Sequence, residues 1–191
     1  WGSLSLYLAQ KFPNCTITAV SNSKTQESYI KNEIQKRKLT NVTYIRSDIT
    51  TLELNETYDR ILSIEMFEHL TNYSKVFQKL SQWSDEQTKL FIHIFTHKDY
   101  PYQLSDNQDE SWLGHHFFAN GMMPSVDLFE KVQNIFKVEK QWIWPGTHYE
   151  KTANHWLKNL ELNKDKVIPL FEKHYGKEES KWLKGVSIKQ N

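Results

Sequence analysis

The sequence has a single cysteine, Cys15, among its 191 residues. One thiol cannot form an internal disulfide, which excludes a disulfide-stabilised scaffold and makes a reducing, cytoplasmic setting the simpler interpretation. There is also no apolar run that approaches the roughly 20 residues a membrane-spanning helix requires. We therefore expect no stable insertion into a membrane.

An excess of charge of one sign is lacking too. Lys and Arg number 24 against 23 Asp and Glu, for a formal net charge of +1. Binding to nucleic acid or to an anionic membrane surface depends on an excess of basic groups, so neither is an expected partner. The length suits one α/β domain spanning residues 1–191. A homodimer remains open.

Short β-branched segments alternate with amphipathic helical segments along the first half of the sequence. The pattern predicts strands at residues 16–20, 42–45, 58–64 and 90–95, and helices at residues 4–12, 24–38 and 69–83. This alternation predicts an α/β class fold with a doubly wound, mostly parallel sheet. Because Gly2 leads directly into a helix, we expect the first strand and most of its loop to be missing from the sequence; a free N-terminal helix is the alternative.

The second half begins with aromatic and polar residues that lack periodicity, at 97–124. A loop of this length is usually functional or disordered, and its aromatic content argues against disorder. Beyond it we predict a helix at residues 125–136 with Ser125 as N-cap, a strand at 138–144, and helices at 153–160, 164–175 and 178–184. Residues 97–124 and 149–191 are expected to form a helical and aromatic cap on the substrate side.

Polar residues follow each predicted strand, where ligands bind in open α/β sheets. They are Ser21-Asn22-Ser23, Asp48-Ile49, Glu65 to His69, and His93 to His97. With Trp1-Gly2 at a helix N-terminus they outline a nucleoside pocket, in which Asp48 would accept a hydrogen bond from an adenine amino group and Ile49 would pack on the ring. Two alternatives stay open: Asn22 as a cap of the next helix, and Asp48 as a turn residue.

The segment Glu65-Met66-Phe67-Glu68-His69 carries two carboxylates and an imidazole at a strand-to-helix turn. A buried carboxylate beside a histidine raises the imidazole pKa, which suits a general base near neutral pH. The alternative is that Glu68 only interacts with the helix dipole. His93 lies inside an apolar strand, where a lone histidine is more often a core residue bonded to backbone than a catalyst. The adjacent pair His115-His116 lacks ligands at suitable spacing, so no metal is expected.

These motifs together resemble the cyclopropane-fatty-acid synthase superfamily of S-adenosylmethionine (SAM)-dependent enzymes, and within it the coclaurine N-methyltransferase-like branch. The similar segments run in order along nearly the whole chain: Trp1 to Ser5, Val20 to Gln26, Arg46 to Ile49, Tyr58 to Ile61, Ser63 to His69, His93 to Lys98, Phe117 to Ser125 and Gly146 to Tyr149. The resemblance implies a Rossmann-like class I methyltransferase fold and SAM as cofactor.

The resemblance also implies roles for individual residues. The implied cofactor-binding residues are Trp1, Gly2, Ser21, Asn22, Gln26, Asp48, Ile49 and Ile64. Glu68 and His69 resemble the catalytic pair of the N-methyltransferases, and Glu65 their carboxylate for the substrate amine. His93 and Tyr149 match the residues that, with the Glu, hold a bicarbonate base in cyclopropane synthases.

Glu65 alone distinguishes the two branches, because cyclopropane synthases generally carry Gly there, whereas His93 and Tyr149 occur in both. An added carboxylate would pair with a cationic nitrogen and has little to do beside an alkene. The expected function is therefore SAM-dependent methyl transfer to the nitrogen of a small-molecule amine, with Glu68 and His69 as general base. The alternatives are a synthase adding a methylene across a lipid double bond, and a non-enzymatic SAM-binding domain.

Overall fold

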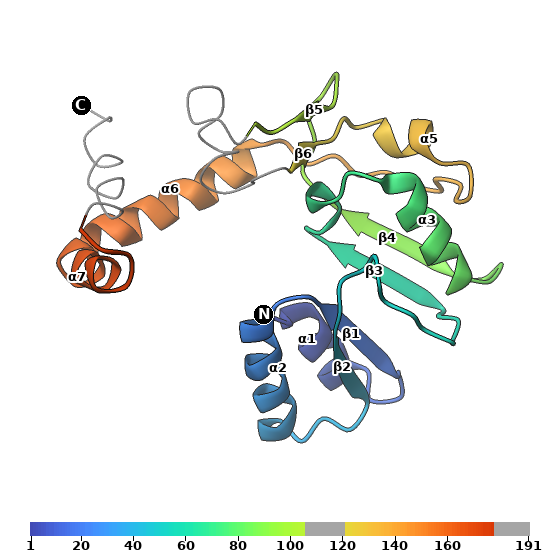
Figure 1. Ribbon diagram of the computed structural model, residues 1–191, viewed down its shortest axis with the longest axis horizontal. Helices are drawn as coiled ribbons and strands as arrows, with labels where there is room; N and C mark the ends of the chain where they lie inside the picture. Colours follow the sequence, from blue (N-terminus) through green and yellow to red (C-terminus); the bar gives the residue numbers. More distant parts are fainter. Residues whose placement is uncertain (106–120, 178–191) are drawn as a thin grey trace. The chain divides into compact units, whose positions relative to one another are not determined.

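The computed structural model describes residues 1–105 and 121–177. The chain divides into two compact units, residues 1–138 and 139–191, each of which is described by itself. In the first unit, short strands alternate with helices along the chain, as Figure 1 shows. The second unit is helical in its described part.

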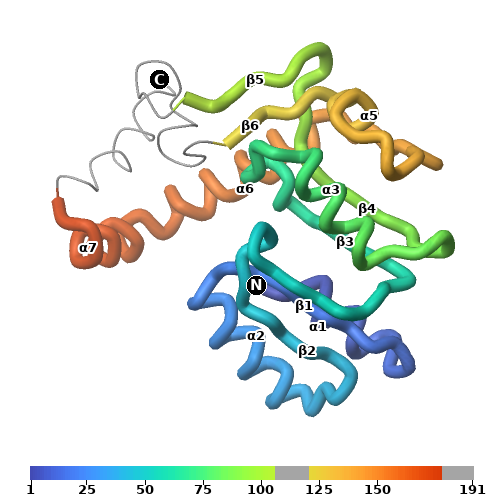
Figure 2. Tube along the Cα trace, turned by 45° about the vertical axis from the view of Figure 1, so that its right-hand side comes forward, coloured from blue at the N-terminus to red at the C-terminus, as the bar shows by residue number. Residues whose placement is uncertain are grey.

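The N-terminal part of the first unit is a βαβ arrangement, the blue segment of Figure 2. Its elements are α1 (Ser3–Lys11), β1 (Ile17–Ser21), α2 (Lys24–Lys36) and β2 (Val42–Arg46). β1 pairs with β2 in parallel, with Ile17 opposite Val42 and Ser21 opposite Arg46. The two helices pack on this pair and on each other. A core of apolar side chains holds the layers together: Leu6, Ala9, Ala19, Ile30, Val42 and Tyr44.

A second parallel pair follows, formed by β3 (Arg60–Ile64) and β4 (Lys89–His93). Between them lie a 3-10 turn η1 (Phe67–His69) and helix α3 (Tyr73–Gln82), which runs along the pair in Figures 1 and 2. The larger core of the unit forms here: Leu52, Phe67, Tyr73, Val76, Phe77, Leu80, Trp83 and Leu128. The predicted alternation of strands and helices, with parallel pairing, is thus confirmed.

The strands form separate pairs among the described residues, where the sequence predicted one doubly wound sheet. Among those residues β1 pairs only with β2, and β3 only with β4, so both edges of each pair lack a partner strand there. Apolar side chains of β1 and β3 are exposed: Val20 at 38 %, Leu62 at 45 % and Ile64 at 44 %. The expected additional strand stays a prediction.

Two predicted helix boundaries are wrong. The helix expected from His69 starts at Tyr73, because Leu70 is extended and the side chain of Asn72 caps α3 by accepting a hydrogen bond from the Lys75 amide. The helix expected from Ser125 shortens to α5 (Leu128–Val132), with Asp127 at its N-cap position. The Ser125 hydroxyl bonds to Asp127 Oδ1 at 2.8 Å and so does not cap backbone.

The same helix ends early because of Gln133. Its side-chain oxygen accepts hydrogen bonds from the backbone amides of Ile135 and Phe136, at 2.8 and 2.7 Å, and this competes with helical bonding. Before α5, two short antiparallel strands pair: β5 (Tyr102–Gln103) and β6 (Met122–Met123). The rest of the predicted loop at residues 106–120 lies outside the described residues.

The strand predicted at residues 138–144 is also wrong. That segment has no strand geometry and no partner strand among the described residues, and Trp142, Ile143 and Trp144 are exposed. A strand needs a neighbouring ladder for its backbone hydrogen bonds, which sequence alternation does not supply.

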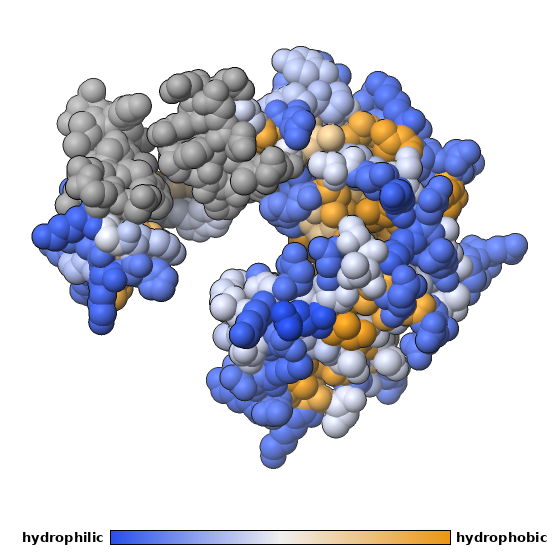
Figure 3. All heavy atoms as spheres, viewed as in Figure 1, coloured by the Kyte–Doolittle hydropathy of each residue, from blue (hydrophilic) through white to orange (hydrophobic). Residues whose placement is uncertain are grey.

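The described part of the second unit consists of α6 (Thr147–Leu162) and α7 (Lys164–Tyr175), which confirms the helices predicted at 153–160 and 164–175. Neither helix buries a residue. On the face shown in Figure 3, α7 presents mainly hydrophilic side chains. The helix predicted at 178–184 lies outside the described residues. None of the helices at 1–105 and 121–177 is long and apolar enough to cross a bilayer.

Candidate active site

The first candidate residues lie at the N-terminus of α1. Gly2 has φ +73°, in the left-handed region that glycine favours, and it precedes the first helical turn. A Cβ at this position would lie 2.8 Å from Cγ1 of Ile30. Backbone and packing therefore both require glycine here. Trp1 is 63 % exposed and meets the ring of Tyr29 edge-on at 5.4 Å.

Three predicted cofactor-binding residues lie at or beside the loop after β1: Ser21 ends the strand, Asn22 lies in the loop, and Gln26 belongs to α2. Ser23, and not Asn22, caps α2: its hydroxyl accepts a hydrogen bond from the Gln26 amide at 3.3 Å. The alternative role of Asn22 as a cap is thus wrong, and its exposed side chain is not used for capping. The Ser21 hydroxyl donates a hydrogen bond to Oε1 of Gln26 at 3.2 Å. These two predicted cofactor-binding residues therefore orient each other's side chains.

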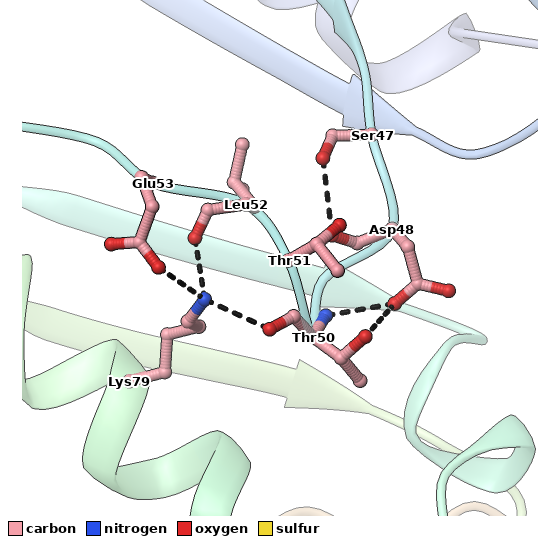
Figure 4. Close-up of polar contacts among 7 residues, drawn as sticks. All are labelled: Ser47, Asp48, Thr50, Thr51, Leu52, Glu53 and Lys79. Carbon is pink, nitrogen blue, oxygen red and sulfur yellow. Dashed lines mark hydrogen bonds and ion pairs between the residues drawn. The ribbon is translucent and has the colours of Figure 1, made fainter.

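Asp48 lies in the turn after β2 (Figure 4). Its Oδ1 accepts hydrogen bonds from the amide and the hydroxyl of Thr50, at 2.8 and 2.7 Å. The hydroxyl, then the amide, of Thr50 hold the pKa of this carboxyl below its usual range. Asp48 is therefore a turn residue, and it is also an exposed, ionised acceptor.

Lys79 of α3 forms hydrogen bonds and an ion pair with the loop that follows Asp48. Its ammonium donates to the carbonyls of Thr50 and Leu52, at 3.1 and 2.6 Å, and pairs with Glu53 at 3.0 Å. Figure 4 shows these three contacts converging on one nitrogen. Ile49 packs against the larger core, which ties the loop to α3.

Glu65 stands directly after β3 in an uncommon backbone conformation. Its φ is +50°, in the left-handed region that costs a side-chain-bearing residue about 1–2 kcal/mol. The Glu65 amide donates to the carbonyl of His93 at 3.0 Å, and Oε1 lies 2.8 Å from Nδ1 of His93. Both side chains are 40 % exposed. The structure thus joins two predicted catalytic residues at the carboxyl ends of β3 and β4.

Glu68 is almost fully buried, at 1 % exposure. The preceding Phe67 is 0 % exposed and lies against the rings of Tyr73, Phe77 and Phe129, which fixes η1 in the core. Burial, followed by the nearby carboxyl of Glu65, raises the pKa of Glu68 to about 8. A carboxyl whose pKa lies this close to neutrality can take up and release a proton near neutral pH, which is the property of a base that works there.

For the other two predicted catalytic residues, His69 and Tyr149, the structure gives a position but does not define a catalytic role. His69 ends η1 and is exposed, with its amide bonded to the carbonyl of Met66 at 3.1 Å. Tyr149 belongs to α6 in the second unit, where its ring meets Trp156 at 6.3 Å. Its role beside Glu68 stays a prediction. Ile64 ends β3 with 44 % of its surface exposed.

Sequence reasoning missed two buried polar residues on the elements that flank the turn of Glu68. Ser63 in β3 and Tyr73 at the start of α3 are 8 % and 4 % exposed, and each reads in the sequence as part of an apolar face. In the part of the chain that the structure describes, no three His, Cys, Asp or Glu side chains are grouped to hold a metal ion. His115 and His116 lie outside that part.

The sequence is similar to those of known methyltransferases and cyclopropane synthases. It is 37 % identical over 172 residues to (S)-coclaurine N-methyltransferase of Thalictrum flavum subsp. glaucum, covering 89 % of this chain and 48 % of that protein. It is 25 % identical over 162 residues to cyclopropane-fatty-acyl-phospholipid synthase of Escherichia coli (strain K12), covering 84 % and 40 %. The chain thus spans about half the length, or less, of these relatives.

A crystal structure of coclaurine N-methyltransferase bound to N-methylheliamine and SAH superposes with a TM-score of 0.85 at 39 % identity. The match covers 95 % of this chain and 54 % of that one. This likeness confirms the Rossmann-like class I methyltransferase fold, although the described strands form separate pairs. The model of the mycolic acid cyclopropane synthetase family matches residues 1–189. The chain therefore belongs to the mycolic acid cyclopropane synthetase family.

Proposed function

We propose that this chain carries the catalytic centre of a SAM-dependent N-methyltransferase that acts on a small-molecule amine. Its relatives include (S)-coclaurine and pavine N-methyltransferases, and the similar crystal structure holds an N-methylated amine with SAH. The observation that carries the proposal is Glu65, a carboxylate held at a position whose backbone favours glycine. The single exposed thiol of Cys15 fits the cytoplasmic setting expected for such an enzyme.

The residues present fit SAM as cofactor. The N-terminus of α1 beyond Gly2 suits a carboxylate, Asn22 is exposed beside the capped start of α2, and Asp48 is an ionised acceptor for an adenine amino group. The bound cofactor supplies a methyl group already activated on a sulfonium. The protein then has to bind the amine, align its nitrogen and remove a proton.

Glu65 binds and orients the substrate in this proposal. Its carboxylate is partly exposed at the end of β3 and already pairs with an imidazole. An ammonium near it would gain a charge-assisted hydrogen bond, which is stronger than a neutral one. Strain of this kind persists where surrounding structure over-determines it, most often at functional sites.

Glu68 is the base. With its pKa raised to about 8, it is mostly protonated in the resting site near neutral pH, whereas a nearby cation favours its ionised form. An arriving ammonium therefore promotes loss of the Glu68 proton through its own charge. The ionised carboxylate then takes the proton from nitrogen, with His69 assisting, and leaves the nitrogen with a free lone pair that could accept the methyl group the cofactor would supply.

Transfer of labelled methyl from SAM to a panel of amines, in the full polypeptide that carries this sequence, tests the proposal. Glu68→Gln is expected to lower kcat about 10²–10⁴-fold, and Glu65→Gln to lower kcat/KM roughly 10–100-fold. Glu86→Gln, which changes an exposed carboxylate in the turn before β4, is the matched control. Near-normal turnover in Glu68→Gln, His69→Ala and the double variant would end the proposal.

Cyclopropane synthesis is the second candidate, because His93 and Tyr149 match the residues that hold the base in that branch. Unsaturated phospholipids belong in the same panel for this reason. Both reactions add one CH₂ unit, so the product structure must be determined by NMR. A cyclopropane product with no methylated amine would select the second candidate.

A further inference from the structure

We propose that Tyr73 is a positioning residue for Glu68, whose buried hydroxyl donates a hydrogen bond, directly or through one buried water, to the ionised carboxylate. The inference deepens the proposed function and rests on the role of Glu68 as base. It assigns a task to a buried polar side chain that the mechanism otherwise leaves unused.

The ring of Tyr73 is fixed beside the turn that carries Glu68. Tyr73 is the first residue of α3, and its ring stacks on that of Phe67 with centroids 6.0 Å apart and planes 12° apart. Phe129 of α5 meets it edge-on at 5.4 Å. Because Phe67 directly precedes Glu68, the ring that holds Tyr73 and the carboxyl belong to the same 3-10 turn. This packing limits how far the two can separate.

One polar atom of each side chain is buried without a hydrogen-bond partner among the described residues. These atoms are Oη of Tyr73 and Oε2 of Glu68, and the hydroxyl of Ser63 in β3 shares this state. Buried polar atoms in folded proteins nearly always have a partner, provided by protein or by ordered water. A phenol is a donor and a carboxylate an acceptor, so these groups are chemically complementary.

Electrostatics supports their proximity. Burial, followed by the nearby carboxylate of Glu68, raises the pKa of Tyr73 to about 12. The phenol therefore keeps its proton across the working pH range and remains a donor.

The titratable groups around Glu68 act in different directions. Glu65 at the end of β3 raises the pKa of Glu68, and Glu65 in turn pairs with His93 at the end of β4. His69 follows Glu68 in the same turn, and α5 contributes the ring of Phe129. A hydrogen bond donated to the ionised form favours that form. Tyr73 on α3 would thus offset the effect of Glu65, and losing its hydroxyl should make Glu68 harder to ionise.

Tyr73→Phe tests this, because it keeps the ring and removes only the hydroxyl. We expect the acidic limb of the kcat–pH profile for amine methylation to move up by roughly one pH unit, with KM for the amine changed less than about two-fold. Tyr58→Phe is the matched control, since it removes a hydroxyl that donates to Thr18 Oγ1 at 3.4 Å. An unmoved limb in Tyr73→Phe, or an equal shift in Tyr58→Phe, would overturn the inference.

A second measurement does not depend on activity. Infrared titration follows the C=O stretch of protonated Glu68, and the band is identified by its loss in Glu68→Gln. Tyr73→Phe should raise the midpoint of this band by the same amount as the kinetic limb. A wild-type protein that methylates no amine would refute the proposed function, while an unchanged infrared midpoint would refute the contact between Tyr73 and Glu68.

Discussion

Glu65 allows backbone strain and substrate recognition to be separated with two substitutions. Its φ of +50° lies in the left-handed region, where a Cβ costs about 1–2 kcal/mol. Glu65→Ala removes the carboxylate and keeps the Cβ, so the strain remains. Glu65→Gly removes both, and the strain is relieved.

The expected difference between the two variants follows from two opposing terms. Glycine relieves the strain and so stabilises the folded protein by about 1–2 kcal/mol, but its greater freedom in the unfolded chain costs about 0.5–1 kcal/mol. The loss of the contacts to His93 and Glu68 is common to both variants and cancels. Glu65→Gly should therefore have a free energy of unfolding roughly 0.5–1 kcal/mol higher than Glu65→Ala.

Ser28 provides the matched control, because it is exposed inside α2. At this ordinary helical position the order should be reversed, with Ser28→Gly less stable than Ser28→Ala by about 1 kcal/mol. Urea denaturation of all four variants measures the two differences with one method. We expect the Gly variant to be the more stable of the two at position 65 and the Ala variant to be the more stable at position 28.

Methyl transfer completes this test. Neither variant at position 65 has a carboxylate, so both should lose amine methylation to a similar extent despite their different stabilities. A Glu65→Gly protein that is less stable than Glu65→Ala would refute the left-handed backbone. Normal amine methylation by either variant would refute the role of the carboxylate.

Three further predictions address other sites. Lys38 has φ +54° just after α2, where the amides of Lys38 and Leu39 donate hydrogen bonds to the carbonyls of Gln35 and Ile34. In the same urea assay, Lys38→Gly should have a free energy of unfolding roughly 0.5–1 kcal/mol higher than that of Lys38→Ala. Because burial raises the pKa of Glu68 from 4.5 to about 8, the stability linked to its proton is full below pH 4.5 and is lost as pH rises through 8. Glu68→Gln should remove that slope from free energies of unfolding measured across this range, and an unchanged slope would contradict the raised pKa. Asp48→Asn should weaken S-adenosylhomocysteine binding in calorimetry roughly 10–100-fold, whereas Asp85→Asn, which alters a similar turn carboxylate before β4, should leave it unchanged.

The sequence predicted elements well where a local signal agreed with burial. β1 and β2 are short β-branched segments, and α2 begins with capping serine and continues with an apolar stripe. Prediction failed where a side chain competed with the pattern. The side chain of Gln133 bonds to the backbone after α5, and the alternating segment at residues 138–144 has no strand geometry and no strand paired with it in the described part of the chain.

The candidate site shows the same division. Residue types and their position after strands were sufficient to predict that Glu65 and His93 lie together at the carboxyl ends of neighbouring strands, whereas the catalytic roles of Glu65, Glu68 and His93 stay predictions. The same residue types and positions could not predict that Glu68 is buried while His69 beside it is exposed, because this depends on Phe67 entering an aromatic core contributed by α3 and α5. Tyr73 was missed for a related reason: an aromatic residue on the apolar face of a helix gives no sequence signal that its hydroxyl is buried and feels the charge of a nearby carboxyl.

The backbone conformation at Glu65 bears on the predicted difference between N-methyltransferases, which carry a glutamate at this position, and cyclopropane synthases, which generally carry a glycine. A glycine would occupy φ +50° without strain, so a synthase that needs no carboxylate there can use it freely. Here the conformation is imposed by its neighbours, since the Glu65 amide is bonded to the His93 carbonyl and η1 begins two residues later with the buried Phe67. The side chain of a glutamate at this point contributes little fold stability, because its pair with His93 is partly exposed and worth at most about 1 kcal/mol, and its contact with Glu68 raises the pKa of that buried carboxyl. The fold therefore explains the left-handed backbone but not the presence of a glutamate where a glycine would be unstrained, and the proposed binding of a substrate ammonium supplies that reason.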